Sequence, residues 1–243
     1  MSMPIETDAC IEQYRRDGVA MLRGAFDPVW CERLLPRARA LAIAAEEEAR
    51  AIGERPALRG LWRTEPLFRD YALNSGAAAL AATVTGSRGV RMAIDQLWAK
   101  PPQSRRITRW HFERAGWPVT GEKLPSVWMP LTPVAAENCL EFAAGSHRWP
   151  REVASLDFVD VDAQRGEGTV QVLAWDLAVG DAVVFHPLTY HAAFRNTARD
   201  WRLAVATRWI GDDIRYAPEM PYFDEGVDFT GCVAGGELSI MSP

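Results

Sequence analysis

A length of 243 residues, with 48% hydrophobic and 24% charged residues, fits one globular domain that buries most of its surface without disulfides. The net charge of −5, without any Lys/Arg-rich run, excludes a typical nucleic-acid-binding protein, because phosphate contacts need a basic face. The four cysteines form no CxxC pair, the first residues do not resemble a signal peptide, and no apolar run approaches the roughly 20 residues that cross a bilayer. We therefore expect a cytoplasmic protein with reduced thiols and no membrane partner.

The first third of the chain is predicted to be mostly helical. Residues 7–17 form an amphipathic pattern that ends at Gly18, and residues 19–24 alternate as a strand does. Asp27 followed by Pro28 is typical of a helix N-cap with proline at the first helical position, and apolar residues recur at helical spacing behind it. A further helix is expected over residues 76–84.

After residue 89 the sequence changes to short apolar strands separated by Gly, Pro, Asn and Asp. Many short strands with frequent turn signals predict a sandwich or jelly roll. The expected strands are residues 91–100, 107–113, 126–134, 139–143, 170–174, 181–186, 191–196 and 203–210. The intervening residues 151–169 show no clear periodicity and are predicted to be a long loop.

The expected fold class is mainly β with flanking helices (α+β), with a double-stranded β-helix or jelly-roll (cupin-like) core. A single domain would span residues 1–243. In it, residues 1–88 would be a mostly helical support, residues 89–216 the jelly-roll core and residues 217–243 a C-terminal extension.

His111 and Glu113 are the first candidates for chemistry. They lie two positions apart in a predicted strand, so their side chains project from one face and Phe112 projects from the other. A third ligand from a distant strand would complete a 2-His-1-carboxylate site, which leaves coordination positions open and is typical of non-haem iron(II) oxygenases. A lone His-x-Glu pair is more often a salt-bridged or core group, so a distal partner is needed.

The distal partner is expected in the segment GDAVVFHPLTYHAAFRNTARDWRLAVATRW, residues 180–209. His191 begins a short strand there, and Arg202 begins an apolar strand eleven residues later. Arginine suits the end-on binding of a carboxylate, because its planar fork donates two parallel hydrogen bonds. His186 lies five residues before His191 and is a rival for the third metal position.

Together these segments resemble the phytanoyl-CoA dioxygenase-like branch of the iron/2-oxoglutarate oxygenases, over residues 92–216. The matching pieces stand in the family's order: LWAKPP, TRWHFE in place of a W-H-x-D stretch, SVWMPLTPVAAENCLEFAAGSHRW ending near G-S-H, GDAVVFHPLTYHAAFRN, and the downstream arginine. Each piece alone is unspecific, whereas five in order are a strong signal.

The resemblance implies His111, Glu113 and His191 as the catalytic metal ligands. It implies that Arg202 pairs with the C5 carboxylate of 2-oxoglutarate, and it favours the later histidine over His186. The resemblance also implies that Trp128 and Lys100 contribute to the cosubstrate pocket. The alternative for Trp128 is packing in the core, and the alternative for Lys100 is a solvated surface charge. His147, after a Gly-Ser turn, is expected to fix a loop by a hydrogen bond rather than to bind metal.

Glu113 departs from the family pattern, which usually has aspartate there. The extra methylene moves the carboxylate oxygens by roughly 1.5 Å, a C–C bond length. Glutamate ligates iron in other branches of the superfamily, so Glu113 stays a ligand, and the alternative is a site that binds metal poorly. A carboxylate also argues against halogenation, because related halogenases have a small residue at this position.

The function implied is an iron(II)- and 2-oxoglutarate-dependent dioxygenase that uses O2, releases succinate and CO2, and hydroxylates, desaturates or cyclises a small molecule. The alternatives are a degenerate or sensory metal-binding jelly-roll protein and a cupin-type hydrolase or isomerase. Four arginines near the metal strand either contact an anionic substrate or are solvated: Arg105, Arg106, Arg109 and Arg114. Asp212 and Asp213 are expected to tie a turn. Substrate identity and oligomeric state stay open.

Overall fold

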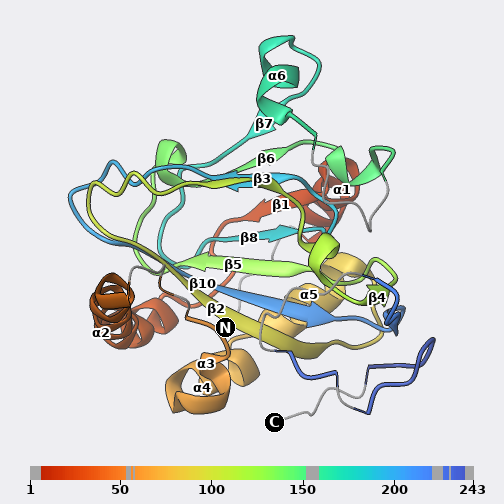
Figure 1. Cartoon of the computed structure of the whole chain (residues 1–243), viewed down its shortest axis with the longest axis horizontal. Helices are drawn as coiled ribbons and strands as arrows, with labels where there is room; N and C mark the ends of the chain where they lie inside the picture. The colour runs from red at the N-terminus through yellow and green to blue at the C-terminus, as the bar shows by residue number, and fades with distance from the viewer. Residues whose placement is uncertain are drawn as a thin grey trace.

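The computed structural model describes residues 7–52, 56, 58–151, 159–220, 227–229 and 231–238. Two antiparallel sheets face each other as two layers (Figure 1). The major sheet contains, in spatial order, β1 (Val19–Leu22), β8 (Ala182–Phe185), β5 (Ser126–Pro130), β10 (Arg202–Ile210) and β2 (Arg91–Lys100). The minor sheet contains β3 (Thr108–His111), β9 (His191–Ala193), β6 (Leu140–Ala143) and β7 (Val172–Leu173). This arrangement is the jelly-roll core that the sequence predicts.

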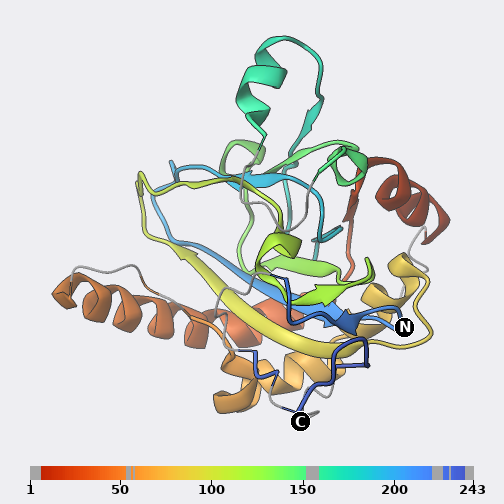
Figure 2. The same ribbon diagram turned by 45° about the vertical axis from the view of Figure 1, so that its right-hand side comes forward.

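Helices cover the outer face of the major sheet (Figure 2). The α-helices are α1 (Thr7–Asp17), α2 (Val29–Ile52), α3 (Leu61–Thr64), α4 (Pro66–Asn74), α5 (Ala77–Thr85) and α6 (Val161–Gly166). Short 3₁₀ turns and a two-stranded ribbon complete the described elements: η1 (Glu113–Gly116), η2 (Ala136–Asn138), η3 (Ser146–Arg148), β4 (Val119–Thr120) and β11 (Arg215–Tyr216). In the described part of the chain, no helix has the length and apolar character needed to span a bilayer.

Strand β10 pairs with β5 on one side and with β2 on the other in the major sheet, and its side chains alternate between the helix-covered face and the face toward the minor sheet. Leu203 and Val205 pack with the helices, whereas Ala204 and Ala206 face the minor sheet. The small alanines leave room between the sheets, and larger side chains from neighbouring strands, such as Trp128, line that space. The sequence of β10 therefore creates an internal pocket between two packed layers.

The predicted elements agree with the structure in type and differ at their ends. Helix α1 and strand β2 have the predicted bounds, and the helical and strand patterns over the remaining segments are confirmed with shifts of a few residues. Helices α3 and α4 were not predicted. The start of α3 is stabilised by a residue that is distant in the sequence, because Asp95 of β2 accepts a hydrogen bond from the Trp62 amide at 3.0 Å. Local sequence cannot reveal such a cap.

The segment 151–169 is not wholly a loop, which corrects the prediction. Helix α6 forms within it because the Asp160 side chain accepts a hydrogen bond from the Ala163 amide at 3.0 Å, an N-cap that satisfies a free helix donor. Residues 152–158 lie outside the described residues. In Figure 1, α6 projects from the minor sheet, away from the helices under the major sheet.

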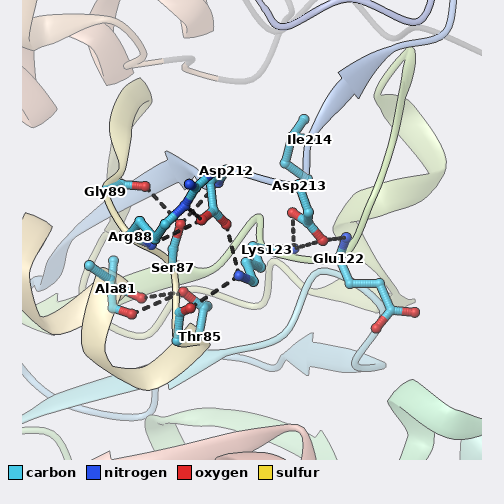
Figure 3. A network of polar contacts seen from close by, with 12 residues as sticks. Ala81, Thr85, Ser87, Arg88, Gly89, Glu122, Lys123, Asp212, Asp213 and Ile214 are labelled. Carbon is cyan, nitrogen blue, oxygen red and sulfur yellow. Dashed lines mark hydrogen bonds and ion pairs between the residues drawn. The ribbon is translucent and has the colours of Figure 1, made fainter.

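Asp212 and Asp213 tie turns together, as predicted (Figure 3). The Asp212 carboxylate accepts from the Arg88 amide at 3.1 Å and from the Lys123 ammonium at 2.8 Å. The Asp213 carboxylate accepts from the amides of Glu122 and Lys123 at 2.9 and 3.1 Å. Three chain segments that are distant in sequence are thereby joined at the end of β10.

Candidate metal centre

Two histidines and one glutamate converge between the sheets. His111 of β3 pairs directly with His191 of β9, and their ring centroids are 4.3 Å apart. Glu113 is the first residue of η1, and its Oε1 lies 3.3 Å from Nε2 of His191. One ligand atom from each of the three residues lies within 4.8 Å of the others, which is the spacing of a metal site.

Strand β3 ends at His111, so Glu113 does not lie on the strand face where the sequence pattern placed it. The chain turns at η1 instead, where the Arg114 amide donates to the Pro187 carbonyl at 2.9 Å. That contact joins the segment after β3 to the loop before β9. The Glu113 carboxylate therefore approaches the two histidines from η1, and η1 is hydrogen-bonded to the loop that precedes His191.

Both imidazoles are oriented for metal binding by backbone carbonyls. Nδ1 of His111 lies 2.8 Å from the Arg109 carbonyl, and Nδ1 of His191 lies 3.1 Å from the Thr189 carbonyl. A carbonyl can only accept, so each Nδ1 carries a proton, and Nε2 is the nitrogen of each ring that is left to bind a metal. Burial, together with the nearby His191, lowers the pKa of His111 to about 4, which keeps this ring neutral at pH 7.

The Glu113 carboxylate is ionised despite its burial. Burial opposes ionisation, but the nearby Arg208 guanidinium outweighs it and holds the pKa of Glu113 well below its ordinary value. Nη2 of Arg208 donates to Oε2 of Glu113. Sequence reasoning did not identify Arg208, although a charged residue within the apolar strand RLAVATRWI was a signal, because a buried cation needs a partner.

A pocket opens beside the triad, and both sheets line it. Arg202 and Trp128 lie in its wall, and both are almost fully buried. Among the described residues, Nε of Arg202 and Nε1 of Trp128 have no hydrogen-bond partner, while Nη1 of Arg202 donates to the Asn138 carbonyl at 2.7 Å. Burial lowers the pKa of Arg202 to about 10, so the guanidinium stays charged at pH 7. Buried donors without a partner favour an anionic ligand.

Lys100 is buried, not solvated, and is not among the residues that line this pocket. Its ammonium donates to the carbonyls of Arg106 at 3.0 Å and Ala193 at 2.8 Å, and to that of Phe194. Lys100 therefore joins the end of β2 to the end of β9. It stands opposite Arg202 in the register of β2 and β10.

The other two histidines lie outside the triad. His147 contacts the Arg15 carbonyl through Nε2 at 3.2 Å, in keeping with the expected loop-fixing role. Nδ1 of His186 accepts from the Leu188 amide at 3.2 Å, and its ring packs against His147 at 5.2 Å. His186 thus lines a second hollow beside Tyr14 rather than the pocket of the triad.

The arginines around β3 have mostly structural contacts. Arg106 forms an ion pair with Glu46 of α2, and Arg114 donates to the Trp117 carbonyl at 3.0 Å. Arg105 and Arg109 are exposed. The structure therefore leaves only exposed arginines for contact with an anionic substrate at this edge.

A jelly roll with two histidines and a carboxylate converging between its sheets defines the class of non-haem iron oxygenases. The chain matches the family model of phytanoyl-CoA dioxygenase (PhyH) over residues 14–204, and it belongs to this family. It is accordingly an oxidoreductase of the dioxygenase type, and the cofactors of the family are iron(II), 2-oxoglutarate and O2. No curated protein sequence matches the chain.

Solved structures share the fold at low sequence identity. The epimerase SnoN from nogalamycin biosynthesis, in complex with Fe³⁺, alpha ketoglutarate and nogalamycin RO, is 22% identical over 96% of this chain and 95% of that chain, with a TM-score of 0.74. The alpha ketoglutarate dependent carbocyclase SnoK is 20% identical over 98% and 96%, with a TM-score of 0.73. AviO1 from Streptomyces viridochromogenes Tue57 is 24% identical over 90% and 100%, with a TM-score of 0.67.

Proposed function

We propose that this protein oxidises a small-molecule substrate, with iron(II) held by His111, Glu113 and His191 and the C5 carboxylate of 2-oxoglutarate held by Arg202. The observation that supports the proposal is that a candidate metal triad and a buried arginine line the same pocket. Three ligand atoms are spaced for one metal ion, and a buried guanidinium beside them keeps its Nε without a partner among the described residues.

The described residues fit both groups chemically. Two imidazoles and one carboxylate suit a ferrous ion, and they leave three positions of an octahedral ion for other ligands. The Arg202 guanidinium and the Trp128 indole N–H are donors that suit the far end of a dicarboxylate. When bound, iron and 2-oxoglutarate supply the oxidising power, with succinate and CO2 as products.

The protein's own residues orient and shield the reacting groups. Arg202 would hold one end of 2-oxoglutarate so that its other end reaches the metal, and the apolar wall around Trp128 would exclude water. Lys100 would act indirectly, because its ammonium donates to three backbone carbonyls and so connects the ends of β2 and β9. Its role at the cosubstrate pocket would be to keep that wall in place.

Hydroxylation is the proposed outcome, with desaturation or ring formation as variants of the same oxidation. The structural neighbour SnoK is a carbocyclase, which supports ring formation as one of these variants. We also propose a cytoplasmic location, where reduced thiols are normal, because Cys10, Cys31 and Cys139 are buried and unpaired.

The test is anaerobic addition of iron(II) and 2-oxoglutarate to the purified protein, followed in the visible absorption spectrum. Wild type should develop the weak metal-to-ligand charge-transfer band, and Arg202→Ala should need a much higher 2-oxoglutarate concentration. Arg105→Ala, which removes an exposed arginine, is the matched control and should behave as wild type. Absence of the band in wild type would favour a degenerate metal-binding protein.

A further inference from the structure

The two oxygens of Glu113 have different partners. Oε1 faces the histidines, 3.3 Å from Nε2 of His191, whereas Oε2 accepts a hydrogen bond from Nη2 of Arg208. Only Oε1 is therefore directed at the metal position. An oxygen that is already bound to a buried guanidinium is less available as a second metal ligand.

Arg208 is itself restrained from several sides. It stands opposite Ser126 in the register of β10 and β5, and its Nε lies 3.4 Å from the Ser126 hydroxyl. Its guanidinium carbon lies 5.0 Å from the centre of the Trp117 ring, a cation–π contact. The register between β10 and β2 shifts directly after Arg208, and such bulges re-aim side chains beside functional sites.

We propose that Arg208 is a positioning residue that keeps Glu113 a one-oxygen metal ligand. The inference rests on the proposed metal site and adds a role that the triad does not contain. A glutamate bound through both oxygens would occupy one of the three positions that 2-oxoglutarate and O2 need. By holding Oε2, Arg208 leaves those three positions open.

The same contact accounts for glutamate at a position where aspartate is usual in the resembling family. Shortening the side chain by one methylene would withdraw the carboxylate by roughly 1.5 Å. An aspartate at residue 113 could then not contact both the metal position and Arg208, whose guanidinium is fixed by Ser126 and Trp117. Glu113 and Arg208 act as a matched pair across the two sheets.

The experiment compares Arg208→Met, Glu113→Asp and the double variant, with Mn(II) and Co(II) as metal probes. Mn(II) affinity is measured by calorimetry, and the coordination of Co(II) by its visible absorption, with and without 2-oxoglutarate. We expect Arg208→Met to weaken Mn(II) binding about 10- to 100-fold, the usual effect of losing a partner of a metal ligand. We also expect an altered Co(II) spectrum and weaker 2-oxoglutarate binding to the Co(II) form.

The double variant separates positioning from a general structural role. If Arg208 acts through Glu113, the double variant binds Mn(II) no more weakly than the weaker of the two single variants. Additive losses accompanied by a lower melting temperature, or a wild-type Co(II) spectrum in Arg208→Met, would overturn the inference. If Arg208→Met does not fold, Arg208→Lys, which keeps the charge, replaces it, and its Mn(II) affinity and Co(II) spectrum are judged in the same way.

Wild type and Arg109→Met, which removes an exposed arginine, serve as controls. A wild-type protein that binds no metal or no 2-oxoglutarate would refute the proposed function itself. If wild type and Arg208→Met bind the metal and 2-oxoglutarate equally well, only the role of Arg208 is refuted.

Discussion

His111 and His191 are direct cross-strand partners, and each donates its Nδ1 proton to a carbonyl two residues earlier in its own strand or loop. The register of β3 and β9 therefore brings the two imidazoles together, and the local backbone sets which nitrogen each ring presents. A metal site of this kind depends on strand pairing as much as on the identity of its ligands.

Removing either ring should abolish metal binding while leaving the fold intact. We expect His111→Ala and His191→Ala to weaken Mn(II) binding by more than about 100-fold, because each removes one of the three ligands proposed among the described residues. His147→Ala, outside the triad, is the control. Mn(II) binding can be followed by electron paramagnetic resonance and the fold by circular dichroism; tight binding in either triad variant would mean that another residue holds the metal.

Gly18 should be intolerant of any side chain. Its φ is +75°, and a Cβ there would lie 2.3 Å from the Thr189 hydroxyl oxygen, whose own hydrogen bond to the Gly18 carbonyl is 2.7 Å long. We expect Gly18→Ala to cost about 2–4 kcal/mol of unfolding free energy, from backbone strain and overlap together. Because the Thr189 carbonyl orients His191, metal affinity should fall as well.

Gly24→Ala is the matched control for this prediction. Gly24 also has a positive φ, +57°, but nothing lies within 4 Å of a Cβ built there. We expect it to lose only about 1 kcal/mol, the cost of the backbone conformation, with unchanged metal affinity. Equal losses of unfolding free energy in the two variants, measured by urea denaturation, would show that the contact with Thr189 is unimportant.

Asp95 should make the protein less stable as the pH rises through the weakly acidic range. Burial raises its pKa to about 7, although the Trp62 amide donates to the carboxylate. The folded state keeps the proton up to about pH 7, whereas the unfolded chain loses it near pH 4, so the unfolding free energy falls between these values. The loss should be on the order of a few kcal/mol.

Asp95→Asn tests this pH dependence, because asparagine cannot ionise and still offers an oxygen to the Trp62 amide. The difference in unfolding free energy between pH 5 and pH 8 should shrink in this variant. Asp200→Asn, at a largely exposed carboxylate, should keep the wild-type pH profile. An unchanged profile in Asp95→Asn would place the titrating group elsewhere.

Asp212 should stabilise the end of β10 through its ionised form. Its hydrogen bonds with Lys123 and Arg88 hold the pKa of this carboxyl well below its ordinary value (Figure 3). The stabilisation is therefore present above about pH 4 and is lost as the pH falls further. Asp212→Asn should melt at a lower temperature than wild type at pH 6, and the difference should narrow at pH 2.5; a constant difference would refute the electrostatic explanation.

The sequence predicted the parts of the site that short patterns encode. His111 and Glu113 stand in one short motif, and His191 and Arg202 follow in the order that the family requires, so their grouping followed from the motifs. The strand spacing was wrong for Glu113, which lies in η1 and not on the face of β3. Arg208 did not follow, because its partner is 95 positions away in the chain. Contacts between residues so far apart in the sequence depend on how the strands align, and a local sequence pattern does not predict that alignment.

The same limit explains the differences in the fold. The jelly roll was predictable because alternation and turn residues recur along the second half of the chain. Helix α3 was not predictable, since its start depends on Asp95, 33 positions later. The burial of Lys100 was also hidden, because its three carbonyl partners come from the loop after β2 and the end of β9.

Glu113 follows the minor sheet in the chain, and its partner Arg208 belongs to the major sheet. An ion bound at the triad would thus also fasten one layer of the barrel to the other. By mass action, metal binding and layer cohesion must reinforce each other, so loading the site should raise the melting temperature and slow amide hydrogen exchange in β3 and β9. The short minor sheet would owe part of its rigidity to the metal that it helps to hold.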